Sequence, residues 1–169
     1  MSKAFSFTTE FEHSVDAVHA ALTSEDYWKG RSGADADADG SSITVSAPAG
    51  PGTIRVEITG RMDPAGLPAV VRGILRGPLE MNRADEWSAL DGDRAQGAMT
   101  GGSSSLPVSI EGRSELRPSA SGGSVVEVTG EVAVKIPVVG GQVEGLVVQM
   151  VESIVHGDQK ELNDWLAAK

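Results

Sequence analysis

The stretch KIPVVGGQVEGLVVQMVESIV, residues 135–155, contains the point at which the sequence changes from strand-like to helical periodicity. A nucleotide-binding loop would lie at such a junction, between a strand and a helix. The stretch has neither the Gly-x-x-x-x-Gly-Lys-Ser/Thr pattern nor the Gly-x-Gly-x-x-Gly pattern that such loops need. We therefore interpret Gly140-Gly141 as a tight turn that lets the chain swing from a strand onto the last helix.

The residues after this turn predict one long amphipathic helix, from about Val138 to Ala168. About thirty residues at ~1.5 Å each would span ~45 Å, enough to cross a whole sheet. Gly145 and Gly157 weaken the helix, and Gly157 is a candidate bend. Apolar residues recur at spacings of three and four, as a buried helical face requires: Val143, Leu146, Val147, Met150, Val151, Ile154, Leu162, Trp165 and Leu166.

Before the turn, period-two alternation predicts about seven strands. Short connections between them favour an antiparallel meander, because parallel neighbours need long crossovers. Two short helices are predicted as well, at 14–22 and 67–77. The predicted strands are 4–11, 42–47, 53–59, 83–90, 94–100, 107–117 and 124–136.

Length, charge and composition limit the function classes. A chain of 169 residues predicts a single domain over residues 1–169 that buries about two-thirds of its surface. The 14 Lys and Arg against 24 Asp and Glu give a formal charge of −10, which argues against nucleic acid as a partner. No apolar stretch is long enough for a signal peptide or a membrane span, and the chain contains no cysteine. We expect a soluble cytoplasmic protein.

The order of elements and three stretches together resemble the START-like or SRPBCC superfamily. The stretches are FSFTTEFEHSVDAVHAAL near the N-terminus, DYW after it, and GEVAVKIPVVGGQVEGLV before the last helix. The chain looks most similar to an uncharacterised bacterial branch known only as a domain of unknown function. The resemblance covers nearly the whole chain and implies an α+β helix-grip fold, in which a curved antiparallel sheet wraps the long C-terminal helix around an apolar cavity.

The same resemblance implies that members bind lipids, sterols, polyketides or other hydrophobic molecules, and that some are cyclases or aromatases. The superfamily has no universal catalytic motif, so the resemblance assigns no catalytic residue to this chain. Composition adds support for a cavity: only three Phe, one Tyr and three Trp are available to fill the space under a wide sheet. A valine-rich interior could leave a void, although it could also interdigitate into a solid core.

If the void exists, the last helix and the strand that contains Trp87 would line it. We expect the helical wall to consist of Val143, Val147, Met150 and Ile154, with Trp87 facing them from the sheet.

Among polar residues, Asp85 is a weak catalytic candidate. Strand alternation places it on the same side as Trp87, and a buried carboxylate beside an aromatic ring has a raised pKa and can act as a general acid or base. The alternative, which we favour, is an aspartate at the edge of a strand that stays in water.

A second polar motif, DADADG, resembles the start of a calcium loop. Asp35, Asp37 and Asp39 alternate before Gly40, but the twelfth position is Ser46 where a bidentate Glu is expected. We interpret the motif as a solvated acidic loop, with a calcium site as the less favoured alternative; whether residues 29–41 form an ordered lid stays open. No metal-type histidine pair, hydrolase elbow or cofactor motif is present.

These observations favour non-catalytic binding or carriage of a small hydrophobic molecule. The first alternative is a cyclase or aromatase type of enzyme in which Asp85 moves protons. The second is a protein-interaction module that uses the outer face of the sheet and has a filled core. The sequence leaves the ligand and the oligomeric state open.

Overall fold

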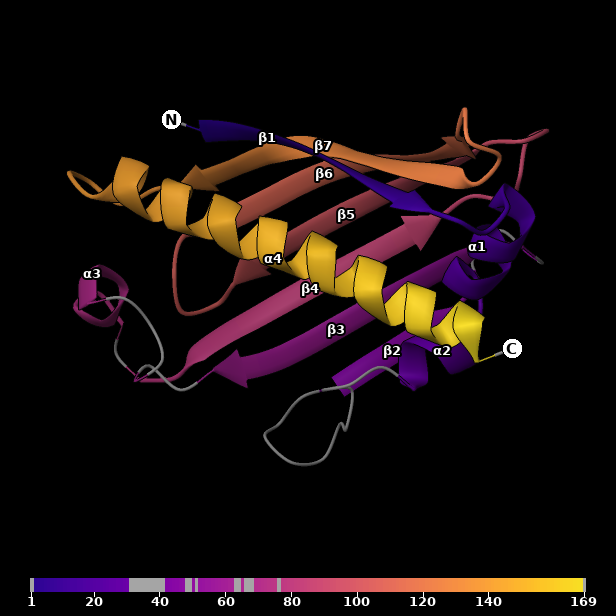
Figure 1. The fold of residues 1–169 in the computed structure, drawn as a ribbon. Helices are drawn as coiled ribbons and strands as arrows, with labels where there is room; N and C mark the ends of the chain where they lie inside the picture. The colour runs from indigo at the N-terminus through magenta and orange to yellow at the C-terminus, as the bar shows by residue number, and fades with distance from the viewer. Residues whose placement is uncertain are drawn as a thin grey trace.

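One sheet and one long helix define the architecture (Figure 1). A computed structural model describes residues 2–30, 42–47, 50, 52–62, 65, 69–75 and 77–168. In this part of the chain seven antiparallel strands form a sheet in the order β1-β7-β6-β5-β4-β3-β2, so β2 to β7 make a meander and β1 pairs with β7. The strands are β1 (Ser2–Phe11), β2 (Ser42–Ser46), β3 (Ile54–Met62), β4 (Leu79–Trp87), β5 (Ala95–Ser103), β6 (Val108–Pro118) and β7 (Ser124–Val134).

The helices lie on one side of this sheet. Figure 1 shows α4 running across the sheet, with α1 and α2 near its C-terminal end and α3 near its N-terminal end. No helix among the described residues is both long enough and apolar enough to pass through a bilayer. The helices are α1 (Val15–Leu22), α2 (Glu25–Lys29), α3 (Ala69–Arg72) and α4 (Gly140–Ala167).

The long C-terminal helix is confirmed, and it continues through Gly157. Its buried side chains repeat every four residues from Val143 to Val155, which aligns them in one stripe along the helix. This stripe packs most closely against β1 and β7 at one side of the sheet. The helix therefore stands nearer to that side than to β3, β4 and β5.

The turn into α4 is built differently from our interpretation. The left-handed backbone conformation belongs to Val138, with φ of 71°, whereas neither residue of the glycine pair has positive φ. Gly140 and Gly141 instead form the first turn of the helix. Gly140 packs closely on the sheet, because a Cβ there would lie 3.2 Å from the carbonyl oxygen of Val134 at the end of β7, which is tighter than an ordinary contact.

Close approach also explains Gly130, where β1, β6 and β7 meet. It pairs with Phe5 on one side and with Gly112 on the other. A Cβ on Gly130 would lie 2.1 Å from the carbonyl oxygen of Glu111 and 2.7 Å from Cζ of Phe5, so no side chain fits. The Phe5 ring covers the space that both glycines leave on the inner face of the sheet.

The short helices differ from the prediction in number and length. The first is confirmed as α1, which Ser14 caps by accepting a hydrogen bond from the backbone N–H of Ala17 at 3.2 Å. The second, α3, covers only Ala69–Arg72 of the predicted 67–77. The additional helix α2 was not predicted, because five residues are too few to show a helical period.

Candidate functional site

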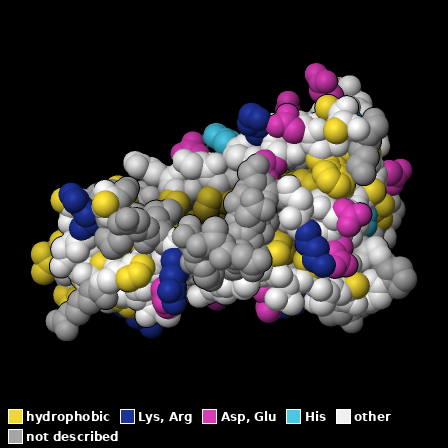
Figure 2. All heavy atoms as spheres, turned by 90° about the horizontal axis from the view of Figure 1, so that it is seen from below, with side chains coloured by type: hydrophobic (Ala, Val, Ile, Leu, Met, Phe, Trp, Pro, Cys, Tyr) yellow, Lys and Arg dark blue, Asp and Glu magenta, His cyan; other side chains and the backbone are white. Residues whose placement is uncertain are grey.

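A cavity of about 580 Å³ lies between α4 and the inner face of the sheet. Strands β2 to β6 form its floor and α4 forms its opposite wall, and most of the lining side chains are apolar. Seen from below, hydrophobic side chains gather in a recessed part of the surface near its middle (Figure 2). The interior of this fold is therefore not solid, and the void has the size of a small-molecule site, about 300–1,000 Å³.

The cavity exists because the helix and the sheet diverge over β5, where the side chains are small. Gly101 on β5 lies between Arg83 on β4 and Ile110 on β6 in the register of the sheet. A Cβ on Gly101 would lie 3.4 Å from Cδ1 of Ile110, at the lower limit of ordinary van der Waals contact. Because Gly101 has no side chain, this part of the cavity floor lies low.

The structure places the four helical residues of the expected wall together. Val143, Val147, Met150 and Ile154 all line the large cavity. Val143 and Val147 are buried, whereas Met150 and Ile154 are half-buried at its border. That these side chains contact a ligand stays a prediction.

Trp87 lies elsewhere. It lines a second, smaller cavity of about 70 Å³, together with Tyr27 and Trp28 from α2. The expected face was right, since Trp87 points inward and is 7% exposed. Its position along the strand is what differs: Trp87 ends β4, about four residues or ~13 Å beyond the part of the strand that borders the large cavity. Alternation predicts on which face of the sheet a side chain lies, but not how far along the strand it lies relative to α4.

An ion cluster lies beside both cavities, since Arg83 lines both of them and its two partners line the smaller one. Nε of Arg83 donates to Oδ2 of Asp85 at 2.6 Å, and Nη2 donates to Oδ1 of Asp85 at 3.2 Å and to Oδ2 of Asp158 at 2.7 Å. The cluster links β4 to α4, because Asp158 belongs to the helix. Burial alone would lower the pKa of the Arg83 guanidinium, but the carboxylates of Asp85 and Asp158 raise it well above its ordinary value.

Asp85 is therefore not the solvated aspartate at a strand edge that we favoured. It is 7% exposed on β4, which lies between β3 and β5 in the sheet. It lines the smaller cavity beside Trp87, and its carboxylate binds Arg83. The charged partner was missed because we assigned faces to Asp85 and Trp87 without extending the alternation two residues back to Arg83.

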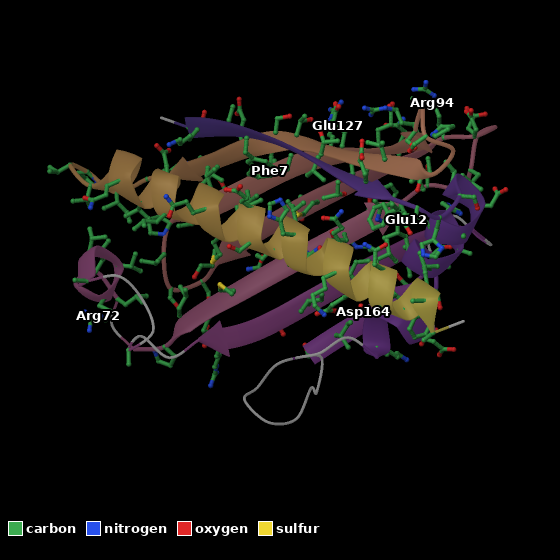
Figure 3. The ribbon with its side chains drawn as sticks, viewed as in Figure 1. Phe7, Glu12, Arg72, Arg94, Glu127 and Asp164 are labelled. Carbon is green, nitrogen blue, oxygen red and sulfur yellow. The ribbon has the colours of Figure 1, made fainter. Side chains whose placement is uncertain are left out.

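Asp158 could also have been found. It follows Met150 and Ile154 at intervals of four residues and therefore lies in the same row along the helix as these two residues. Most other charged side chains lie outside the interior: Arg72 on α3 projects outward, and Arg94 and Glu127 project from the side of the sheet that faces away from α4 (Figure 3).

The metal candidates give no site in the described part of the chain. Asp35, Asp37 and Asp39 lie outside the described residues, as does most of the 29–41 segment. Among the residues that are described, no group of three or more His, Cys, Asp or Glu side chains is arranged to hold a metal ion. His19 has a structural contact, since its Nε2 lies 2.8 Å from the carbonyl oxygen of Ser88.

Comparison with known proteins gives the family. Residues 6–166 match the model of a family described as protein of unknown function DUF2505. The chain belongs to this family. One relative is the uncharacterized protein Rv0481c of Mycobacterium tuberculosis, which is 30% identical over 171 residues and covers 98% of both chains.

Solved structures show the fold of this DUF2505 chain. The di-domain ARO/CYC StfQ from the steffimycin biosynthetic pathway is similar with a TM-score of 0.64 and 12% identity, over 99% of this chain and 51% of that chain. A START superfamily protein from Mycobacterium smegmatis is similar with a TM-score of 0.55 and 13% identity, over 96% and 98% of the two chains. The predicted START-like helix-grip fold is thus confirmed.

Proposed function

We propose that this protein binds a small hydrophobic molecule in the cavity between α4 and the sheet. The observation that carries the proposal is the cavity of about 580 Å³ and its apolar lining. Apolar voids of this kind are poorly hydrated and gain free energy when apolar groups fill them. Binding requires no catalytic group, so it fits the lack of a catalytic motif in the sequence.

The cavity also bears on the two alternative functions, a protein-interaction module and an enzyme. An interaction module with a filled core does not agree with an interior void of this size. The cyclase or aromatase hypothesis keeps some support, because a buried polar cluster borders the cavity and one similar fold is an ARO/CYC protein. Asp85 is a weaker proton carrier than we expected, since it lies at the smaller cavity and binds Arg83.

A variant that fills the cavity tests the binding proposal directly. Met150→Trp adds a large side chain at the helical wall, and the void offers the space that a solid core would not. We expect Met150→Trp to keep its circular dichroism spectrum and to lose at least tenfold in affinity for a neutral fluorescent probe such as Nile red.

The matched control is Glu152→Trp, which adds the same side chain at an exposed position of α4. If Glu152→Trp lowers the affinity for Nile red as much as Met150→Trp does, the probe does not bind in the cavity. Native mass spectrometry of the purified protein then identifies any molecule that copurifies with it. Turnover of a polyketide-like substrate that is lost in Asp85→Asn would instead favour the enzyme.

A further inference from the structure

Two buried polar groups at the smaller cavity, Nε1 of Trp87 and Oγ of Ser114, have no hydrogen-bond partner among the described residues. Trp87 is 7% exposed and Ser114 is 9% exposed, so bulk water has little access to either group. Thr9 lines the same cavity, but its hydroxyl group donates to the carbonyl oxygen of Val126 at 3.4 Å. Because a buried polar group without a partner is costly, the pair of Trp87 and Ser114 points to a further molecule or group in this cavity.

The register of the sheet brings the two groups close together. Trp87 on β4 pairs with Gly97 on β5, and Gly97 pairs in turn with Ser114 on β6. A Cβ on Gly97 would lie 3.1 Å from both Cδ2 and Cε2 of Trp87, so the indole ring lies over this glycine. Nε1 is bonded to Cε2 and therefore lies near β5, whose distance from the strand of Ser114 is about 4.8 Å. One oxygen atom between the two groups can form hydrogen bonds with both.

The size of the smaller cavity limits what can bind there. About 70 Å³ is room for a few water molecules or for one small polar group of a larger ligand. An indole N–H only donates, whereas a serine hydroxyl group both donates and accepts. A ligand hydroxyl group reproduces the hydrogen bonds of a water molecule that it displaces, and a methyl group of similar size does not. The two polar groups therefore favour a hydroxyl group over an apolar one.

The smaller cavity adjoins the large one. Trp28, Arg83 and Met99 line both cavities. Met99 lies on the inner face of β5, between Gly97 beneath the Trp87 ring and Gly101 in the floor of the large cavity. A methionine side chain is unbranched and has three rotatable bonds, so it adapts to a ligand that passes beside it. A ligand in the large cavity is thus one side chain away from Trp87 and Ser114.

We propose that the smaller cavity is the subsite for a hydroxyl group of the ligand, which accepts a hydrogen bond from Nε1 of Trp87 and forms a second one with Oγ of Ser114. The apolar body of the ligand fills the large cavity and passes Met99. This inference rests on the proposed function and adds the chemical class of the ligand, a mostly apolar alcohol or phenol. Trp87 and Ser114 determine which end of the ligand enters first.

Two probes of equal size test the subsite. 2-Naphthol and 2-methylnaphthalene differ only in that a hydroxyl group replaces a methyl group, and both are uncharged at neutral pH. Competition with Nile red gives the ratio of their two affinities for each protein. Ser114→Ala removes one partner of the hydroxyl group, and Trp87→Phe removes the other. Since one hydrogen bond changes affinity by roughly two- to tenfold, each variant should lower the ratio of naphthol to methylnaphthalene affinity by about this factor.

The matched control is Ser109→Ala, which makes the same change on the same strand. Ser109 is exposed and points to the outer face of the sheet, away from both cavities. Its replacement should leave the ratio unchanged. The affinity for 2-methylnaphthalene should be the same in Ser114→Ala as in the wild-type protein, because this probe has no hydroxyl group.

Three outcomes would overturn the inference. If Ser114→Ala leaves the ratio unchanged, the ligand hydroxyl group does not reach the smaller cavity, which then holds water only. If Ser114→Ala and Ser109→Ala lower the ratio equally, the effect does not come from this subsite. If neither Nile red nor either probe binds the wild-type protein, the proposed function fails as well, which distinguishes that failure from a missing subsite. Should Trp87→Phe not fold, Ser114→Ala, which removes a single oxygen atom, still decides the question.

Discussion

Replacing Arg83 with methionine should destabilise the fold strongly, because its guanidinium holds two carboxylates between sheet and helix. The variant loses contacts of 2.6, 3.2 and 2.7 Å. Removing one partner of a buried ion pair costs about 3–5 kcal/mol. The side chain of Asp85 is 10% exposed and that of Asp158 is 27% exposed, so solvent screens the second pair in part. We expect a loss of about 3 kcal/mol, at the lower end of that range.

The wild-type contribution of Arg83 should not vary with pH in the neutral range. Burial alone would lower its pKa, but Asp85 and Asp158 raise it above the ordinary value. A group whose pKa is raised in the folded state gives its full stabilisation below the unfolded-state value and loses it only as pH rises through the folded-state value. For an arginine both values lie far above neutrality, so the deficit of Arg83→Met is expected across the neutral range.

Urea unfolding followed by circular dichroism measures this deficit. With a denaturant slope of about 1–3 kcal/mol/M, a loss of about 3 kcal/mol lowers the midpoint by roughly 1–3 M. The matched control is Arg94→Met, since Arg94 is 55% exposed and pairs with Glu115 at 3.2 Å on the outer side of the sheet. Exposed pairs contribute about 0–1 kcal/mol. Equal losses in the two variants would refute the reasoning that burial gives the cluster its strength.

Two further predictions concern packing in the sheet and at α2. Gly130→Ala should lower the melting temperature by several degrees, because its Cβ would lie 2.1 Å from the carbonyl oxygen of Glu111. Gly141→Ala should raise the melting temperature slightly, since nothing lies within 4 Å of that position in the helix. A Gly130→Ala variant as stable as the wild-type protein would contradict the close approach. Trp28→Phe removes the hydrogen bond from Nε1 to the carbonyl oxygen of Leu22 at 2.7 Å. The free energy of unfolding should fall by about 1 kcal/mol more than the smaller ring alone explains. A fall no greater than that of a size-matched substitution would contradict this prediction.

Particular residues show how far sequence reasoning reached. Alternation in β7 and the spacing of valines in α4 predicted the sheet, the helix and their facing surfaces, because both patterns repeat over ten residues or more. The glycine pair at the start of α4 misled us about the turn, since the unusual backbone conformation belongs to Val138. A residue with strong β preference gives no local signal for such a turn.

The residues expected to line one cavity are divided between two cavities. The four residues of the helical wall line the large cavity, whereas Trp87 lies at the smaller one. Periodicity alone predicts that the four residues lie on one face of the helix. The position of Trp87 also depends on how far along the strand it lies relative to α4. This distance depends on how α4 crosses the sheet, which no periodicity encodes.

The sequence by itself determined the layers of this protein: which segments are strands, which face of each is apolar, and which segment covers them. Local periodicity decides these features because each one depends on neighbours a few residues away. Only the tertiary structure decided the cavity and the cluster of Arg83 with Asp85 and Asp158. Arg83 and Asp158 are 75 residues apart in the chain and lie 2.7 Å apart in the structure. The way in which α4 packs on the sheet determines which side chains come into contact and where a void remains.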